Sequence, residues 1–146
     1  MNRSDLEAFM KKQGIPMPDS GPKRILVVDD DPIIVETVVM GLTEDQHGYE
    51  VESAKDGFEA GLKVQSFRPH VVILDIMMPG IKGYDVCRMI KENPETRSTK
   101  VIVLSAYLDK DKFDRMEENG ADICFCKPLP LPQLKKEVAA ILGLTD

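Results

Sequence analysis

The sequence predicts an α/β fold in which a doubly wound, five-stranded parallel sheet carries helices on both faces. Two observations lead to this prediction. From residue 23 onward, five short apolar segments alternate with five longer segments of helical periodicity, a pattern typical of parallel sheets with right-handed crossovers. The third apolar segment, 71–74, holds three β-branched residues in four and no polar side chain, as expected of a strand buried on both faces. The 146 residues are enough to form one core without disulfides.

A separate segment, 1–22, precedes this domain of residues 23–146. Residues 4–14 predict one short helix, with Ser4 as its N-cap, Glu7 completing a capping box and Gly14 ending it. Three prolines between residues 15 and 22 predict a linker. One helix cannot bury its own apolar face, so we expect it to dock on the main domain, to dock on a second copy of the chain, or to fray.

The elements of the main domain follow from the positions of their apolar residues and breakers. Strands are expected at 24–28, 49–54, 71–75, 101–104 and 123–126, and helices at 32–43, 57–66, 84–91, 109–119 and 131–142. Pro32 suits the first turn of the first of these helices, which Asp31 would cap, and Gly120 ends the fourth. The strands are therefore separated by helices long enough to make parallel crossovers.

Composition excludes several classes of protein. No apolar run approaches the ~20 residues of a membrane span and no signal peptide is evident, so we expect a cytoplasmic location and no membrane partner. A net charge of −6 argues against a broad nucleic-acid surface. The spacing of Cys87, Cys124 and Cys126 indicates neither a disulfide framework nor a zinc site, and we expect Cys124 and Cys126 to be small core residues. His47 and His70 are isolated from other ligand-type residues.

Polar residues stand where the predicted strands end. Asp29 and Asp30 follow the first strand and Asp75 the third, while Ser105 follows the fourth and Lys127 the fifth. The carboxyl ends of parallel strands meet at one edge of a sheet, so these side chains should share one crevice. Carboxylates that close repel one another unless a cation neutralises them, and an all-oxygen cluster suits Mg²⁺. With a metal and a lysine present, a carboxylate there could accept a phosphoryl group.

Each residue also has a purely structural interpretation. The acidic run before Pro32 favours the start of a helix, and Asp75 alone could be a turn residue. Ser105 could lie near the N-cap of the next helix, and Lys127 could be a solvated loop lysine. These interpretations do not explain why all of the polar residues fall at strand ends.

Four segments in order resemble the receiver domain of two-component response regulators: Val27 to Pro32, Val72 to Gly80, Val103 to Ala106 and Gly120 to Pro128. The resemblance extends from about Lys23 to Leu142. It implies a flavodoxin-like (CheY-like) sheet of order 2-1-3-4-5. It also implies a switch that catalyses only its own phosphorylation and dephosphorylation, and is not otherwise an enzyme.

The resemblance assigns roles at the strand ends. Asp75 would accept a phosphoryl group from the phosphohistidine of a histidine kinase. Asp29, Asp30, Asp75 and the backbone carbonyl of Met77 would hold Mg²⁺ or Mn²⁺, with Asp29 acting through water.

Two further roles, and one backbone feature, are implied in the same way. Ser105 would hydrogen-bond the phosphoryl oxygen and shift when it arrives, and Lys127 would pair with it. The peptide bond between Lys127 and Pro128 would be cis, a geometry that only X-Pro bonds adopt cheaply.

The implied partners are a sensor histidine kinase or a phosphotransfer protein, and an unknown downstream protein. A homodimer is one alternative, and DNA would be a partner only through an output domain outside this chain. The alternative function is a phosphorylation-independent pseudo-receiver that acts as a protein-interaction module. A phosphatase of the haloacid-dehalogenase type would have a second Asp two residues after its nucleophile, and Met77 occupies that position here.

The segment from Asp5 to Pro16 resembles the last helix of excisionase-like helix-turn-helix modules, so residues 1–22 are either a remnant of one or a docking helix.

The sequence departs from the receiver pattern at two places. Cys124 stands where the family usually has Tyr or Phe, and Phe125 should face the opposite side of the strand. The readout could therefore use Tyr107 instead. Met77 and Tyr107 would also flank the path of an attacking water, and their bulk predicts slow self-dephosphorylation.

Overall fold

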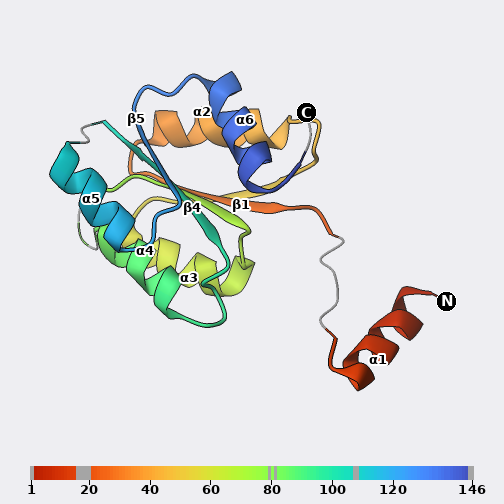
Figure 1. The fold of residues 1–146 in the computed structure, drawn as a ribbon. Coiled ribbons are helices and arrows are strands. Elements are labelled where there is room, and N and C mark those ends of the chain that lie inside the picture. Colours follow the sequence, from red (N-terminus) through yellow and green to blue (C-terminus); the bar gives the residue numbers. More distant parts are fainter. Residues whose placement is uncertain (1, 16–20, 79, 81, 107–108, 145–146) are drawn as a thin grey trace.

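The computed structural model describes residues 2–15, 21–78, 80, 82–106 and 109–144. Its centre is a five-stranded parallel sheet in the order β2-β1-β3-β4-β5 (Figure 1). The strands are β1 Arg24–Val28, β2 Glu50–Ala54, β3 Val71–Leu74, β4 Lys100–Ser105 and β5 Ile123–Cys126. The predicted fold class and strand order are confirmed.

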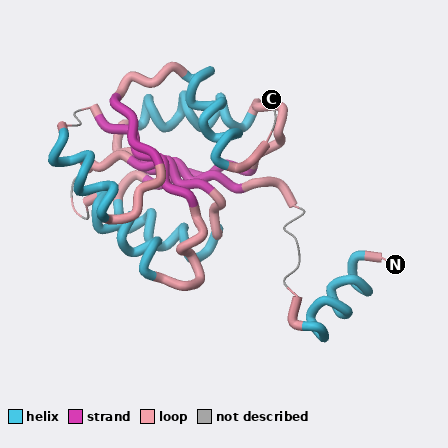
Figure 2. The backbone as a smooth tube through the Cα atoms, viewed as in Figure 1, coloured by secondary structure: helices cyan, strands magenta, loops and turns pink. Residues whose placement is uncertain are grey.

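Helices cover both faces of the sheet. They are α1 Arg3–Gln13, α2 Pro32–Thr43, α3 Gly57–Phe67, α4 Gly83–Glu92, α5 Lys110–Glu118 and α6 Leu131–Ile141. Figures 1 and 2 show α2 and α6 on one face and α3, α4 and α5 on the other. No helix in the described ranges is both long and apolar enough to cross a membrane.

The alternation of side chains along β3 divides the core into two layers. Val72 and Leu74 pack with residues of α3, α4 and α5, whereas Val71 and Ile73 pack with residues of α2 and α6. All four side chains are at most 3% exposed, as the run of apolar residues predicts. Burial on both faces fixes β3 as the central strand, and its carboxyl end lies in the middle of the sheet edge.

Side-chain caps explain where several of the helices begin. Asp31 caps α2 as predicted, since its side chain accepts a hydrogen bond from the Ile33 N–H at 2.9 Å. Asp109 was expected to be the first residue of a helix, but it is the N-cap of α5, which begins at Lys110. The prediction for α1 is wrong by two residues: Asn2, and not Ser4, is the N-cap, because its side-chain oxygen accepts the Asp5 N–H at 2.8 Å. Asn and Ser cap comparably well, so sequence alone does not choose between them.

The N-terminal helix leaves apolar side chains in solvent. Leu6 is 38% and Phe9 51% exposed, and Figure 1 shows α1 set apart from the sheet. Gly14 ends the helix as predicted, in the left-handed conformation that glycine adopts without strain.

The cysteines differ in their surroundings. Cys87 is buried and Cys124 is half-buried against the same core layer, and burial raises the pKa of these thiols to about 12 and about 11. Both therefore stay protonated and unreactive near neutral pH. The expectation that Cys126 is a core residue is wrong, because it is exposed as the last residue of the edge strand β5. Phe125 packs in the opposite core layer from Cys124, as predicted.

Candidate functional site

The parallel register of the central strands brings the acidic residues together. Val28 of β1 lies beside Leu74 of β3, so the residues that follow them, Asp29 and Asp75, emerge side by side. The Asp75 N–H donates to the Val28 carbonyl at 3.0 Å, which continues the ladder to the very end of the strand. The backbone hydrogen bonds of the sheet thus position both carboxylates.

Three carboxylates form one cluster at this edge. The carboxylate oxygens of Asp29, Asp30 and Asp75 lie within 4.8 Å of one another. Asp29 and Asp75 are only 5% and 6% exposed, whereas Asp30 is open to solvent. Several hard oxygen donors, mostly shielded from water and open on one side, fit Mg²⁺, which binds a few carboxylates and keeps some of its waters.

A lysine from the end of β5 neutralises part of this charge. The Lys127 Nζ lies 2.6 Å from Asp29 Oδ2 and 3.4 Å from Asp75 Oδ2. Burial alone would lower the pKa of Lys127, but the hydrogen bond to Asp29 and the charges of Asp75 and Asp29 outweigh it and raise that pKa. The side chain is only 15% exposed, so it is no solvated loop lysine. One ammonium cannot balance three carboxylates, and the cluster retains negative charge for a further cation.

The remaining oxygens of the two buried carboxylates accept backbone hydrogen bonds. Asp75 Oδ1 accepts the Met77 N–H at 3.0 Å, and Asp29 Oδ1 accepts the Asp31 N–H at 3.0 Å. Burial raises the pKa of Asp75, helped by the charge of Asp29 and opposed by the Met77 N–H and by Lys127. These contacts hold the Asp75 carboxylate in one orientation, with Oδ2 toward the lysine.

Ser105 ends β4 at the same edge of the sheet. The residue is fully buried, and its carbonyl accepts the Lys127 N–H at 2.8 Å, which ties the end of β4 to the start of the β5–α6 loop. The peptide bond between Lys127 and Pro128 is cis.

Sequence reasoning missed the part played by Gly83, the first residue of α4. A Cβ there would lie 2.6 Å from the Ile76 Cα and 2.9 Å from the Asp75 carbonyl oxygen. The absence of a side chain lets α4 pack directly on the segment that follows Asp75. A glycine at a helix start was the only signal in the sequence, and it does not reveal what lies opposite.

The other candidate residues lie around this edge or outside the described part of the chain. The Met77 side chain is 54% exposed. Cys124 lies in β5, half-buried beside the residues of α5. Tyr107 lies outside the described residues, so its expected role is a matter for experiment.

The 2-1-3-4-5 parallel sheet, with an acidic crevice and a paired lysine at its carboxyl edge, defines a flavodoxin-like domain. The model of the response regulator receiver domain matches residues 25–139. The chain therefore belongs to the response regulator receiver family of two-component signalling.

Individual relatives agree with this assignment. The chain is 32% identical over 124 residues to the DNA-binding dual master transcriptional regulator RpaA of Synechocystis, covering 84% of this chain and 50% of RpaA. It is 33% identical over 119 residues to the phosphate regulon transcriptional regulatory protein PhoB of Rhizobium meliloti, covering 82% of this chain and 52% of PhoB. The chain thus spans about half the length of these curated relatives.

A solved structure matches the domain over nearly its whole length. The signal receiver domain of a DNA-binding response regulator (merR) from Colwellia psychrerythraea superimposes with a TM-score of 0.78 at 30% identity. The match covers 83% of this chain and 98% of that one.

Proposed function

We propose that Asp75 accepts a phosphoryl group from the phosphohistidine of a sensor histidine kinase or phosphotransfer protein, with Mg²⁺ or Mn²⁺ bound in the crevice. The observation that carries the proposal is the position of Asp75, which is buried beside two carboxylates and 3.4 Å from the Lys127 ammonium. Phosphoryl transfer depends mainly on positioning and on neutralising the oxygens of the transferred group, and the crevice has residues for both tasks.

In the proposed step, a carboxylate oxygen of Asp75 forms the new bond to phosphorus as the bond from phosphorus to the imidazole nitrogen breaks. The electron pair of that bond stays on the imidazole, which takes up a proton as needed. Asp29, Asp30, Asp75 and the Met77 carbonyl would hold the metal, whose charge would offset that of the phosphoryl oxygens. Lys127 would pair with one of these oxygens.

The product would act as a switch. An aspartyl phosphate adds charge and acceptor oxygens within reach of Ser105 and Lys127, and drawing these groups inward would bias a nearby surface toward one of two states. With Cys124 at the usual aromatic position, the readout would use another side chain, for which Tyr107 is the candidate. The partner reading that surface would be a downstream protein or a second copy of the chain, and DNA only through an output domain outside this chain.

The alternative, a pseudo-receiver that works without phosphorylation, is not favoured. Such a module would be expected to lack at least one group of the crevice, whereas Asp29, Asp30, Asp75, Ser105 and Lys127 are all present.

We further propose that the domain works in the cytoplasm, and that residues 1–22 form a helix and linker separate from the receiver at 23–146. Exposure of Leu6 and Phe9 supports that division.

Intact-mass spectrometry after incubation with acetyl phosphate tests the proposal. We expect a gain of one phosphoryl group that requires Mg²⁺ and is lost in Asp75→Ala. The matched control is Asp31→Asn, which removes a neighbouring carboxylate but keeps a side-chain oxygen to cap α2. No gain in the wild type under any condition would overturn the proposal and favour the pseudo-receiver.

A further inference from the structure

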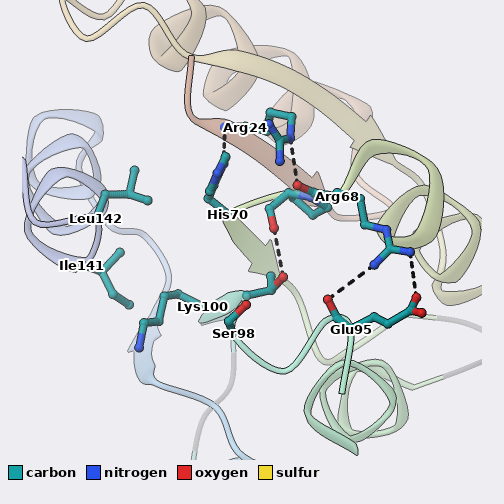
Figure 3. A pocket seen from close by; sticks show the side chains of 10 residues that line it. Arg24, Arg68, His70, Glu95, Ser98, Lys100, Ile141 and Leu142 are labelled. Atoms are coloured by element: carbon teal, nitrogen blue, oxygen red, sulfur yellow. Dashed lines mark hydrogen bonds and ion pairs between the residues drawn. The ribbon is translucent and has the colours of Figure 1, made fainter. Parts of the chain in front are cut away.

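A second concave site lies at the opposite edge of the sheet from Asp75. It is a cavity of about 360 Å³ where β1 and β4 begin, bounded by the loop before β3 and the end of α6 (Figure 3). This volume falls in the range of small-molecule sites.

The charge of this cavity is opposite to that of the whole protein. Arg24, Arg68 and Lys100 line it together with one carboxylate, that of Glu95, and with His70. The chain as a whole carries a net charge of −6. A concave cluster of cations on an acidic protein concentrates positive potential and favours an anion over a neutral ligand.

Hydrogen bonds hold the basic residues in place. The backbone N–H of Arg24 donates to His70 Nδ1 at 2.9 Å, so the proton of a neutral His70 is on Nε2. Arg24 Nε donates to the Arg68 carbonyl at 2.8 Å. Arg68 has a backbone φ of 52°, which is uncommon for a residue other than glycine, and this conformation ends α3. Arg24 and the backbone of Arg68 are therefore held in place before a ligand arrives.

Two of the cations are accessible. Arg68 pairs with Glu95 through Nη2 and Oε2 at 2.9 Å, but the two side chains are 43% and 67% exposed. An ion pair this exposed is weak and easily rearranged. The Lys100 backbone N–H donates to the His70 carbonyl, while its exposed ammonium makes no ion pair with any residue that the structure describes.

The remaining wall is apolar. The buried Pro69 also lines the cavity. Ile141 and Leu142, at the end of α6, face the cavity from the other side (Figure 3). Cations on one side and aliphatic groups on the other suit a ligand with an anionic group and a compact organic body. Several cations favour a group with about two negative charges, which a phosphomonoester carries near pH 7 and a single carboxylate does not.

We propose that this cavity binds a small organic phosphomonoester of the nucleoside monophosphate type. Its phosphate would lie between Arg24, Lys100 and Arg68, and its organic part against Ile141 and Leu142. β1 and β3 run from this edge to the acidic crevice, about 15 Å away at the rise of a strand. Binding here would need neither Mg²⁺ nor Asp75, so the site is independent of the proposed phosphorylation.

The test is a titration of the ¹⁵N-labelled full chain with adenosine monophosphate at fixed ionic strength, in buffer containing EDTA. We expect saturable shifts of the amide resonances of Arg24, Arg68, His70 and Lys100, with a Kd of about 1 mM or tighter. Inorganic phosphate should bind more weakly and adenosine not measurably. Equal affinities for inorganic phosphate and adenosine monophosphate would overturn the assignment to an organic ligand.

Variants separate the site from general charge effects. Lys100→Gln should weaken binding by about tenfold, whereas Lys136→Gln, which removes an exposed lysine elsewhere on α6, should leave it unchanged. Asp75→Ala should also bind normally. Equal weakening in both lysine variants, loss of binding in Asp75→Ala, or absence of shifts in the wild type would each overturn the proposal.

Discussion

The Asp75 carboxylate and the Lys127 ammonium are held in fixed positions by their neighbours in the crevice. The carboxylate is held by the Met77 N–H on one oxygen and faces the lysine with the other. The lysine is held in turn by Asp29 at 2.6 Å. Each group limits the freedom of the next, so the arrangement is positioned before any phosphoryl donor arrives, and this preorganisation is what positioning catalysis requires.

Replacing the lysine should therefore slow phosphorylation. Lys127→Gln removes the charge that offsets Asp29, Asp75 and the incoming phosphoryl oxygens, and we expect the rate with acetyl phosphate to fall by about 10². The rate is measured by intact-mass spectrometry at several times. Lys135→Gln on α6 is the matched control, and equal rates in the two variants would show that Lys127 takes no part in the transfer.

The exposed Met77 offers a second test at this scale. Its bulk and lack of a polar group should hinder the water that hydrolyses an aspartyl phosphate at Asp75, so the phosphorylated state should be long-lived. Met77→Asn should speed its decay by about tenfold, because an amide can orient that water. The side chain is 54% exposed, so the fold should not change. Rapid decay of the wild type, unchanged in Met77→Asn, would contradict the prediction.

At the scale of elements, the close approach of α4 to the loop after β3 couples stability to the site. A Cβ at Gly83 would press on the backbone of Ile76, which cannot move aside without displacing Asp75. We expect Gly83→Ala to lower the free energy of unfolding by about 1–3 kcal/mol in urea denaturation and to slow phosphorylation.

Gly61 in α3 provides the control for that substitution. A Cβ there would meet only the flexible end of Met89, at 3.4 Å. Gly61→Ala should therefore stabilise the protein by up to about 1 kcal/mol, since alanine favours the helix. Loss of stability in both variants would show that the close packing at Gly83 is not the cause.

The turn between α2 and β2 carries a pH-dependent contribution. Burial alone would raise the pKa of Asp45, but the hydrogen bonds from the backbone and ring of His47, with the charges of His47 and Lys135, outweigh it and lower that pKa. The folded state thus binds protons less readily than the unfolded one. The ionised Asp45 therefore stabilises the folded state fully above its unfolded pKa of about 3.9. This stabilisation is lost as the pH falls through the pKa that Asp45 has in the folded state.

Urea denaturation of Asp45→Asn measures that contribution. The substitution should cost about 1 kcal/mol at pH 6, and the difference from wild type should shrink as pH falls below about 4. Glu92→Gln, on the exposed end of α4, is the control for a lost surface carboxylate. A difference that stays constant from pH 6 to pH 3 would contradict the prediction.

At the scale of the whole molecule, the acidic crevice stores electrostatic repulsion that folding brings about. The carboxylate of Asp75 is far from those of the adjacent Asp29 and Asp30 in the unfolded chain, and it comes within 4.8 Å of them when the sheet forms. A cation that binds only the folded state should stabilise the protein through mass action, by about 2.7 kcal/mol at 100 times its Kd. We expect Mg²⁺ to raise the Tm saturably and EDTA to reverse the effect.

Neutralising one carboxylate of the crevice should weaken the dependence of the Tm on metal. Asp29→Asn removes part of the repulsion and one metal ligand, so the Tm should respond less to Mg²⁺ than that of wild type. Measurement in Ca²⁺-free buffer at constant ionic strength separates binding from screening. A Tm that rises equally in wild type and variant would indicate a general salt effect and not a site.

The sequence by itself determined the alternation of strands and helices, the apolar run of the doubly buried strand 71–74 and the polar residues at the strand ends. These features are local, because the periodicity of apolar residues and the breakers around them follow from backbone geometry within a few residues. The helix caps were only partly predictable, since Asn2 and Ser4 are both good caps and small differences in the first turn decide between them.

Only the tertiary structure decided which distant residues meet. The sequence predicted a shared crevice for Asp29 and Lys127, but the structure decided their direct contact at 2.6 Å. It also exposed Cys126 at the end of an edge strand and opposed Gly83 to the backbone of Ile76. It also gathered Arg24, Arg68 and Lys100 at the far edge of the sheet. No local pattern encodes such contacts, because they depend on the register of parallel strands and on the packing of helices across the sheet, which are set by the whole core at once.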